Sequence, residues 1–267
     1  MGADGQKIIK RRGYAVVASL LLVATVMPVA AVAQDAPAEK GALRMTPYIW
    51  AAGFQGTLGV PNSSSSGLPG SRVGTSFGKL VDNIEIAGGG MLMVDWRKGK
   101  WSLFGDWTYA ALKSDVGSPF GALYSGVEGQ VKGNVVQGAV GYALLQEGET
   151  RVDVYGGLRY YDVNVLLRLQ PGLLTQQSLT VSQAWTDGVI GTRYEGRMSG
   201  NWYETIQLDV GKGGSNFAAQ GSVAIAYRYS WGDITGGWRY LKADYEKNSF
   251  RYDVALSGPF LGASFRF

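Results

Sequence analysis

Residues 250–267, FRYDVALSGPFLGASFRF, alternate between apolar side chains and small or polar ones. In the second half of this stretch the apolar positions all have odd numbers: Leu261, Ala263, Phe265 and Phe267. The positions between them hold Gly262, Ser264 and Arg266. A period of two with apolar side chains on one face indicates a β-strand that separates two different environments.

The first half of the same stretch has the opposite parity, because its apolar residues Val254 and Leu256 have even numbers. A one-residue slip in a two-residue period transfers every side chain to the other face of the strand. We therefore expect a β-bulge at Gly258-Pro259, where the residue types tolerate an irregular backbone.

The alternation recurs along most of the chain, for example in residues 101–115 and 217–229. It predicts about ten strands (8 or 12 are alternatives), each long enough to provide the roughly 9–11 residues that cross a bilayer. The connections alternate between tight turns, at 98–100, 147–149, 199–201 and 230–233, and mostly longer Gly/Ser-rich segments. The fold class predicted is all-β: a transmembrane antiparallel up-and-down β-barrel, with its short turns and both termini in the periplasm.

Aromatic residues near the short turns support this prediction: Trp96, Trp101, Trp202, Tyr229 and Trp231. Trp and Tyr are enriched where a membrane meets water. A soluble sandwich would account for the alternation, but it would not account for the asymmetric turns, the aromatic girdle and an aromatic last residue together.

Four stretches resemble a proteobacterial family of uncharacterised outer-membrane barrel proteins: TPYIWAAGFQGTLGV (46–60), VDNIEIA (81–87), WSLFGDWTYAAL (101–112) and residues 238–267. The resemblance implies a fold and a location but no activity. The closing strand also resembles the carboxy-terminal signal of such barrels, so Phe265 and Phe267 are expected to be read by the barrel-assembly machinery, with periplasmic chaperones assisting biogenesis.

Residues 1–33 have the features of a cleaved signal peptide: a basic start, an apolar run from Tyr14 to Val29, and Ala31-Val32-Ala33 before the expected cleavage. Residues 34–43 are expected to form a periplasmic linker and 44–267 the barrel, in the bacterial outer membrane. Without 1–33 the chain keeps 21 basic and 20 acidic residues. Its basic character therefore belongs to the signal, and we expect outer-membrane lipid and lipopolysaccharide as partners and no nucleic acid.

The chain contains no His and no Cys. Nucleophilic triads, thiolate metal sites and disulfides therefore cannot form. No Walker loop or HExxH spacing is present. We expect no catalytic residues, no cofactor and no metal, and we do not expect an enzyme.

Charged residues take the parity opposite to the apolar face, which predicts that they line the lumen: Glu85, Asp95, Arg97, Asp106, Arg151, Arg159, Arg193, Arg197, Asp209, Arg228 and Arg239. Both signs are interleaved, so mutual pairing that fills the lumen is one interpretation. An aqueous path with a selective lining is the other. We expect a narrow passive pore for small solutes or amphiphiles. The alternatives are a structural or stress-related envelope protein and an adhesin or receptor that acts through its surface loops.

Overall fold

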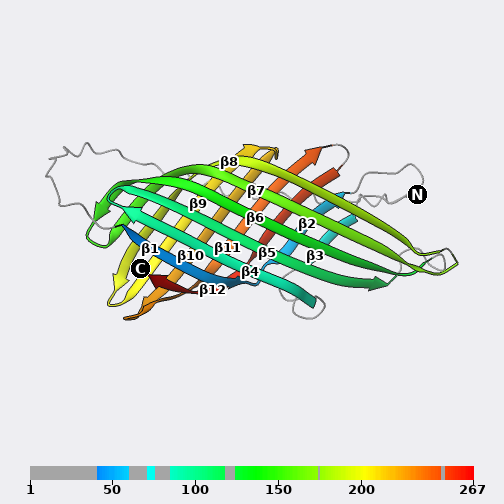
Figure 1. Ribbon diagram of the computed structural model, residues 1–267, viewed down its shortest axis with the longest axis horizontal. Coiled ribbons are helices and arrows are strands. Elements are labelled where there is room, and N and C mark those ends of the chain that lie inside the picture. Colours follow the sequence, from blue (N-terminus) through cyan, green and yellow to red (C-terminus); the bar gives the residue numbers. More distant parts are fainter. Residues whose placement is uncertain (1–40, 60–70, 76–84, 118–123, 174, 248–249) are drawn as a thin grey trace, which may run out of the picture. The chain divides into compact units, whose positions relative to one another are not determined.

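The computed structural model describes residues 41–59, 71–75, 85–117, 124–173, 175–247 and 250–267. These residues form twelve β-strands (Figure 1), with the bounds β1 Ala42–Trp50, β2 Gly53–Gly59, β3 Ser71–Thr75, β4 Glu85–Lys98, β5 Trp101–Gly117, β6 Tyr124–Glu147, β7 Thr150–Pro171, β8 Gln177–Ser199, β9 Trp202–Gly213, β10 Phe217–Arg228, β11 Gly232–Lys247 and β12 Phe250–Arg266.

The strands close into a ten-stranded antiparallel barrel. From β4 to β12 each strand pairs with the next, and β12 pairs back to β1 and β2, which are one strand interrupted at Ala51-Ala52. At the closure, Phe267 N–H donates to the carbonyl oxygen of Leu43 (2.8 Å), and Leu43 N–H donates to that of Phe267 (3.2 Å). The short β3 pairs with β2. The predicted barrel and its strand number are confirmed.

Tight turns join the strands at one end of the barrel. Gly99, Gly148 and Gly200 occupy three of them with φ of 54°, 55° and 55°. This left-handed conformation is costly for residues with a Cβ, which explains glycine at these positions. At the opposite end, β9 and β10 are also joined by only three residues, 214–216, so the expectation of longer connections there holds for only some of the strand pairs.

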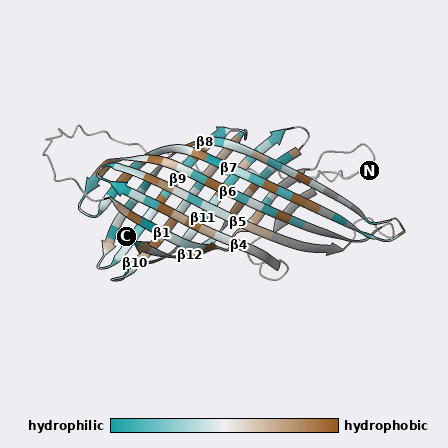
Figure 2. Cartoon of the chain, viewed as in Figure 1, coloured by the Kyte–Doolittle hydropathy of each residue, from teal (hydrophilic) through white to brown (hydrophobic). Residues whose placement is uncertain are grey.

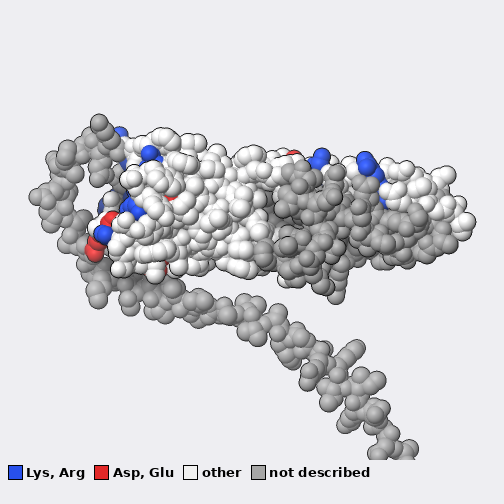
Figure 3. Space-filling model, turned by 90° about the horizontal axis from the view of Figure 1, so that it is seen from below, with Lys and Arg blue, Asp and Glu red and all other residues white. Residues whose placement is uncertain are grey.

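Figure 2 shows hydrophobic and hydrophilic residues alternating along the strands. The exposed large hydrophobic side chains form an apolar belt between two aromatic girdles. Near the tight turns lie Trp101, Tyr142, Trp202, Tyr229, Trp231 and Phe265. Farther from the turns lie Trp107, Trp238, Tyr160 and Tyr240; on β5, Trp107 is roughly 20 Å along the strand from Trp101. On the face seen in Figure 3, Lys, Arg, Asp and Glu gather at one end, and a few more lie along one edge beyond a belt of other residues. This is the outer surface that a bilayer requires.

The expected bulge at Gly258-Pro259 is wrong. β11 and β12 pair without a register shift from Lys247↔Phe250 to Gly232↔Phe265. Val254, which is 1 % exposed, therefore faces the interior on the same side as Ser264. The parity of the apolar residues changes because the apolar face of the strand changes from the outside to the inside of the barrel. Beyond the upper girdle, the outer surface carries polar pairs such as Lys242–Asp253, and the interior is an apolar core.

The predicted signal peptide, most of the predicted linker and segments 60–70 and 76–84 lie outside the described residues. The described part of the chain contains no helix long and apolar enough to cross a membrane.

Candidate functional site

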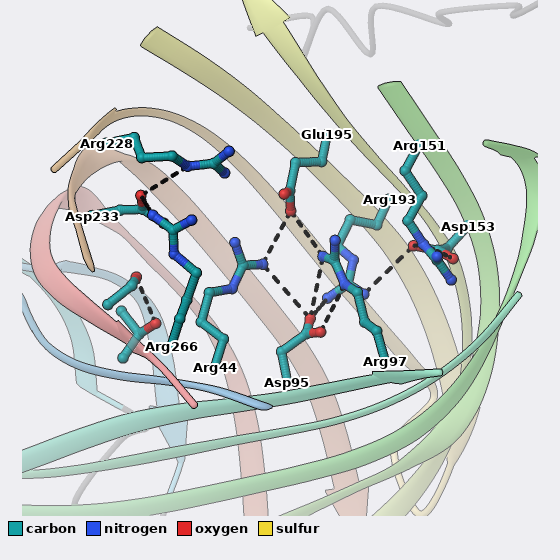
Figure 4. A network of polar contacts seen from close by, with 12 residues as sticks. Arg44, Asp95, Arg97, Arg151, Asp153, Arg193, Glu195, Arg228, Asp233 and Arg266 are labelled. Carbon is teal, nitrogen blue, oxygen red and sulfur yellow. Dashed lines mark hydrogen bonds and ion pairs between the residues drawn. The ribbon is translucent and has the colours of Figure 1, made fainter. Parts of the chain in front are cut away.

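The lumen is the candidate functional site, because the inward side chains of all ten strands converge there. Nearest to the tight turns lies a network that we call the lower charge network, formed by Arg44, Asp95, Arg97, Arg193 and Glu195 (Figure 4). Arg44 and Arg97 donate to Glu195 at 3.0 and 2.8 Å. Arg97 Nε also donates to Asp95 at 2.8 Å, and Arg193 pairs with the same carboxylate. Two carboxylates thus bridge three guanidinium groups from β1, β4 and β8.

Arg151 extends this network toward the turns. Its Nε donates to Asp153 at 2.9 Å, while its Nη1 and Nη2 donate to the carbonyl oxygens of Gly99 and Lys100 at 3.0 and 3.1 Å. Asp153 also lies 3.5 Å from Arg193. One side chain therefore ties the charged lumen to the β4–β5 turn.

Further ion pairs lie at the mouth of the barrel. Asp233 accepts from Arg228 at 3.3 Å and also pairs with Arg266. Glu149, in the β6–β7 turn, accepts from Tyr203 and Arg197, both at 2.6 Å. The hydrogen bond from Tyr203, followed by that from Arg197, lowers the pKa of Glu149 below its ordinary value.

Farther inward, Arg159 and Asp209 form a completely buried pair. Both side chains are 0 % exposed, and Arg159 Nη2 lies 2.7 Å from Asp209 Oδ1. Gln137 Oε1 accepts from Arg159 Nε and Nη2 at 3.0 and 2.6 Å, and Tyr155 donates to Asp209 at 2.9 Å. Four side chains from β6, β7 and β9 thus fill this level of the lumen.

A second buried group faces that pair from β11. Arg239 forms an ion pair with Asp106 and donates to Tyr48 Oη (2.6 Å) and Gln220 Oε1 (2.9 Å). Tyr48 in turn donates to Asp106 at 2.7 Å. A cavity of about 50 Å³ remains between Arg193 and Arg239. That volume holds a few water molecules but no solute.

Above these charges the lumen is apolar and aromatic. We define the aromatic cluster as Tyr161, Trp185, Tyr245, Phe250 and Tyr252. Trp185 stacks between Tyr161 and Tyr245, with ring centroids 4.9 and 4.3 Å away, and meets Tyr252 edge-on at 5.4 Å. Valines of β7, β8 and β12 pack around it. The outer part of the lumen is therefore closed by a packed core.

The structure places ten of the eleven predicted lumen charges on the inner side of the barrel: Asp95, Arg97, Asp106, Arg151, Arg159, Arg193, Asp209 and Arg239 inside, and Arg197 and Arg228 at the mouth. The side chain of Glu85 lies outside the described residues. Phe265 faces outward in the lower girdle.

Sequence reasoning missed several partners of these charges: Arg44, Glu149, Asp153, Glu195, Asp233 and Arg266. The parity signal was available for Asp153 and Glu195, which alternate with outward apolar residues. Tyr48 was also missed as a lumen residue because it alternates like an outward aromatic. No local signal distinguishes the two faces at that position.

The chemistry that this lumen supports is ion pairing and packing. Arg is positioned by carboxylates at every polar level, and within the described ranges no group of three or more Asp, Glu, His or Cys could hold a metal ion. A closed ten-stranded wall with an apolar belt and two girdles is a transmembrane β-barrel of the bacterial outer membrane.

Solved structures with a similar fold are outer-membrane proteins. The attachment invasion locus protein Ail of Yersinia pestis is 11 % identical, over 86 % of this chain and 99 % of that chain, with a TM-score of 0.34. The outer membrane protease OmpT of Escherichia coli is 10 % identical, over 85 % and 96 %, with a TM-score of 0.42. The toluene transporter TodX of P. putida is 10 % identical, over 86 % and 90 %, with a TM-score of 0.31.

A scan against protein-family models finds no match, and neither does a search of curated protein sequences. TM-scores of this size carry no argument about function. The resemblance to an uncharacterised family of outer-membrane barrels therefore stays a prediction, and the fold stands on the strand pairing itself.

Proposed function

We propose that this protein is a surface-recognition barrel, which binds extended polypeptide at the outer edge of its wall and does not conduct solutes in bulk. The observation that carries the proposal is the unequal height of the strands. β7 and β8 pair up to Leu169↔Gln177, whereas β8 and β9 pair only up to Asp187↔Gly213. The outer part of β8 is therefore an edge strand within the described residues.

This edge presents unused backbone groups. Gly214 N–H donates to the Thr186 carbonyl oxygen (2.9 Å), which shows that the backbone of Thr186 faces away from β7. By the alternation of an antiparallel ladder, Ser178, Thr180 and Ser182 direct their N–H and C=O groups the same way. Their side chains are exposed.

The edge also lacks the residues that normally prevent strand addition. Natural edge strands are commonly protected by Lys, other charges or Pro. Residues 177–185, QSLTVSQAW, contain no charged residue and no Pro. Addition of an extended peptide to such an edge supplies main-chain hydrogen bonds, and alternate side chains supply specificity. No catalytic role is part of the proposal.

The narrow pore is the second candidate, and one observation favours it. Charged and polar side chains occur in the lumen from the mouth to the Arg159 level, and they share the lining of the 50 Å³ cavity with Met93, Phe104 and Phe260. Against it, the aromatic cluster fills the lumen above that level. A pore would require these rings to move.

Two measurements distinguish the candidates. Cells that display the protein are tested for adhesion to surfaces coated with unfolded casein, a mixture of extended chains, with native albumin as the comparison. Thr180→Pro removes one edge donor and should abolish the adhesion, whereas Thr180→Ser keeps the donor and should retain it. Planar bilayers should show no steady current. Adhesion no greater than that of cells without the protein, or a large steady conductance, would overturn the proposal.

A further inference from the structure

An open apolar groove of about 560 Å³ crosses the outward face of strands β4 to β7. Its outward lining includes Val94, Leu103, Gly105, Gly138, Val140 and Leu158. The volume is within the range of roughly 300–1,000 Å³ that is usual for ligand pockets. We call it the β4–β7 groove.

Glycine residues on β5 and β6 create the groove, although the packing of the barrel leaves room for a larger side chain at these positions. Gly105 and Gly138 pair directly across β5 and β6 and form the floor. A Cβ at Gly138 would meet no atom within 4 Å, and one at Gly105 would come no closer than 3.7 Å to another atom. By contrast, a Cβ at Gly157, on the inner side, would lie 2.1 Å from a backbone oxygen. Larger residues would therefore fit at the floor but would fill the groove.

The groove has walls on both sides of this floor. One row of outward side chains lies nearer the upper girdle, where Trp107 pairs with Val136, and another lies nearer the tight turns, where Leu103 pairs with Val140. These rows are four residues apart on β5, or roughly 13 Å along the strand. A flexible hydrocarbon chain fits between them.

Two cations lie where the groove approaches the tight turns. Lys98 and Lys100 are exposed, and Lys100 Nζ lies 5.9 Å from the centre of the outward Tyr142 ring. Among the described residues, neither lysine takes part in an ion pair. Trp101, 58 % exposed, marks the membrane–water boundary beside them and lies four residues from Gly105 on the same face of β5. The two lysines thus place positive charge at the depth of the lipid headgroups, next to the apolar β4–β7 groove.

We propose that the β4–β7 groove is a specific site for a phospholipid of the periplasmic leaflet. One acyl chain lies over Gly105 and Gly138, and the phosphate contacts Lys98 and Lys100. The apolar groove complements the hydrocarbon chain of a phospholipid, and the two unpaired lysines beside it complement the anionic phosphate. This site is independent of the recognition edge on β8.

The test uses the full-length protein, purified from membranes in mild detergent and titrated with dipalmitoyl phosphatidylglycerol during native mass spectrometry. We expect one tightly retained lipid. Gly138→Leu should weaken its apparent affinity about tenfold by filling the floor. Lys98→Gln with Lys100→Gln should weaken it about fivefold and remove its dependence on salt. The matched control is Gly236→Leu, on the outward face of β11, where a Cβ meets its nearest atom at 3.5 Å.

Heat-dependent gel migration verifies that each variant is folded. Equal retention by Gly138→Leu and Gly236→Leu would mean that the lipid is unspecific, and it would overturn the site. A crosslinked dimer that Gly138→Leu abolishes would overturn it as well, because the groove would then hold a second copy.

Discussion

Substitution of Asp209 by Ala tests whether the lumen is stabilised by buried ion pairing. Arg159 and Asp209 are both 0 % exposed, and their closest atoms are 2.7 Å apart. Removal of one partner from a buried pair costs about 3–5 kcal/mol, because the remaining charge is left without compensation. Arg159 keeps its two hydrogen bonds to Gln137. We therefore expect the lower end of that range, about 3 kcal/mol, which is roughly a hundredfold in the unfolding equilibrium.

The matched control is Asp253→Ala, which breaks the outward pair with Lys242. These side chains are 30 % and 29 % exposed, so the expected cost is about 0–1 kcal/mol. The free energy of unfolding is measured by urea titration of the protein in lipid vesicles, at an unchanged m-value. The double change Arg159→Met with Asp209→Leu should cost less than Asp209→Ala alone, since neither charge remains. Equal costs for Asp209→Ala and Asp253→Ala would refute buried pairing as the stabilising interaction.

Three further predictions concern the lumen, the closure and the wall. Arg159→Ala with Arg193→Ala should leave conductance in planar bilayers low, and the further change Trp185→Ala should raise it, because the aromatic cluster closes the lumen above the charges; a full increase from the first two changes alone would contradict this. Deletion of Phe267 should reduce the yield of heat-modifiable protein in the membrane more than Phe267→Tyr does, because it also removes the closing backbone hydrogen bonds; an undiminished yield would exclude a role in assembly. Gly237→Ala should lower the urea midpoint, because its Cβ would lie 2.1 Å from a backbone oxygen of β10; an unchanged midpoint would show that the strands can separate at no cost.

Much of the fold could be predicted from local pattern. The outward positions of Trp101, Leu103 and Trp107 follow from a period of two, and the tight turns follow from Gly between charged or small residues. These signals are local because a strand meets lipid on one face along its whole crossing. The number of strands and the inward direction of the charged side chains follow from this same two-residue alternation.

The partners of the lumen charges could not be predicted in this way. Arg44 and Glu195 are 151 residues apart in the chain, and they meet only because the barrel closes. Arg159 likewise finds Asp209 two strands away. The parity of a residue shows which face of its strand it occupies. The height in the barrel at which its side chain meets a partner depends on the stagger of all ten strands.

The sequence by itself determined that this chain is a barrel with an apolar outer belt, because alternation, turns and girdle are properties of each strand alone. Only the tertiary structure decided where the lumen changes from charged to apolar and where β8 loses its neighbour. Val254 and Leu256 show the reason: above the membrane, water replaces lipid outside and packed rings replace charges inside. A period of two is the same in both environments, so the pattern identifies two faces but does not say which of them is buried.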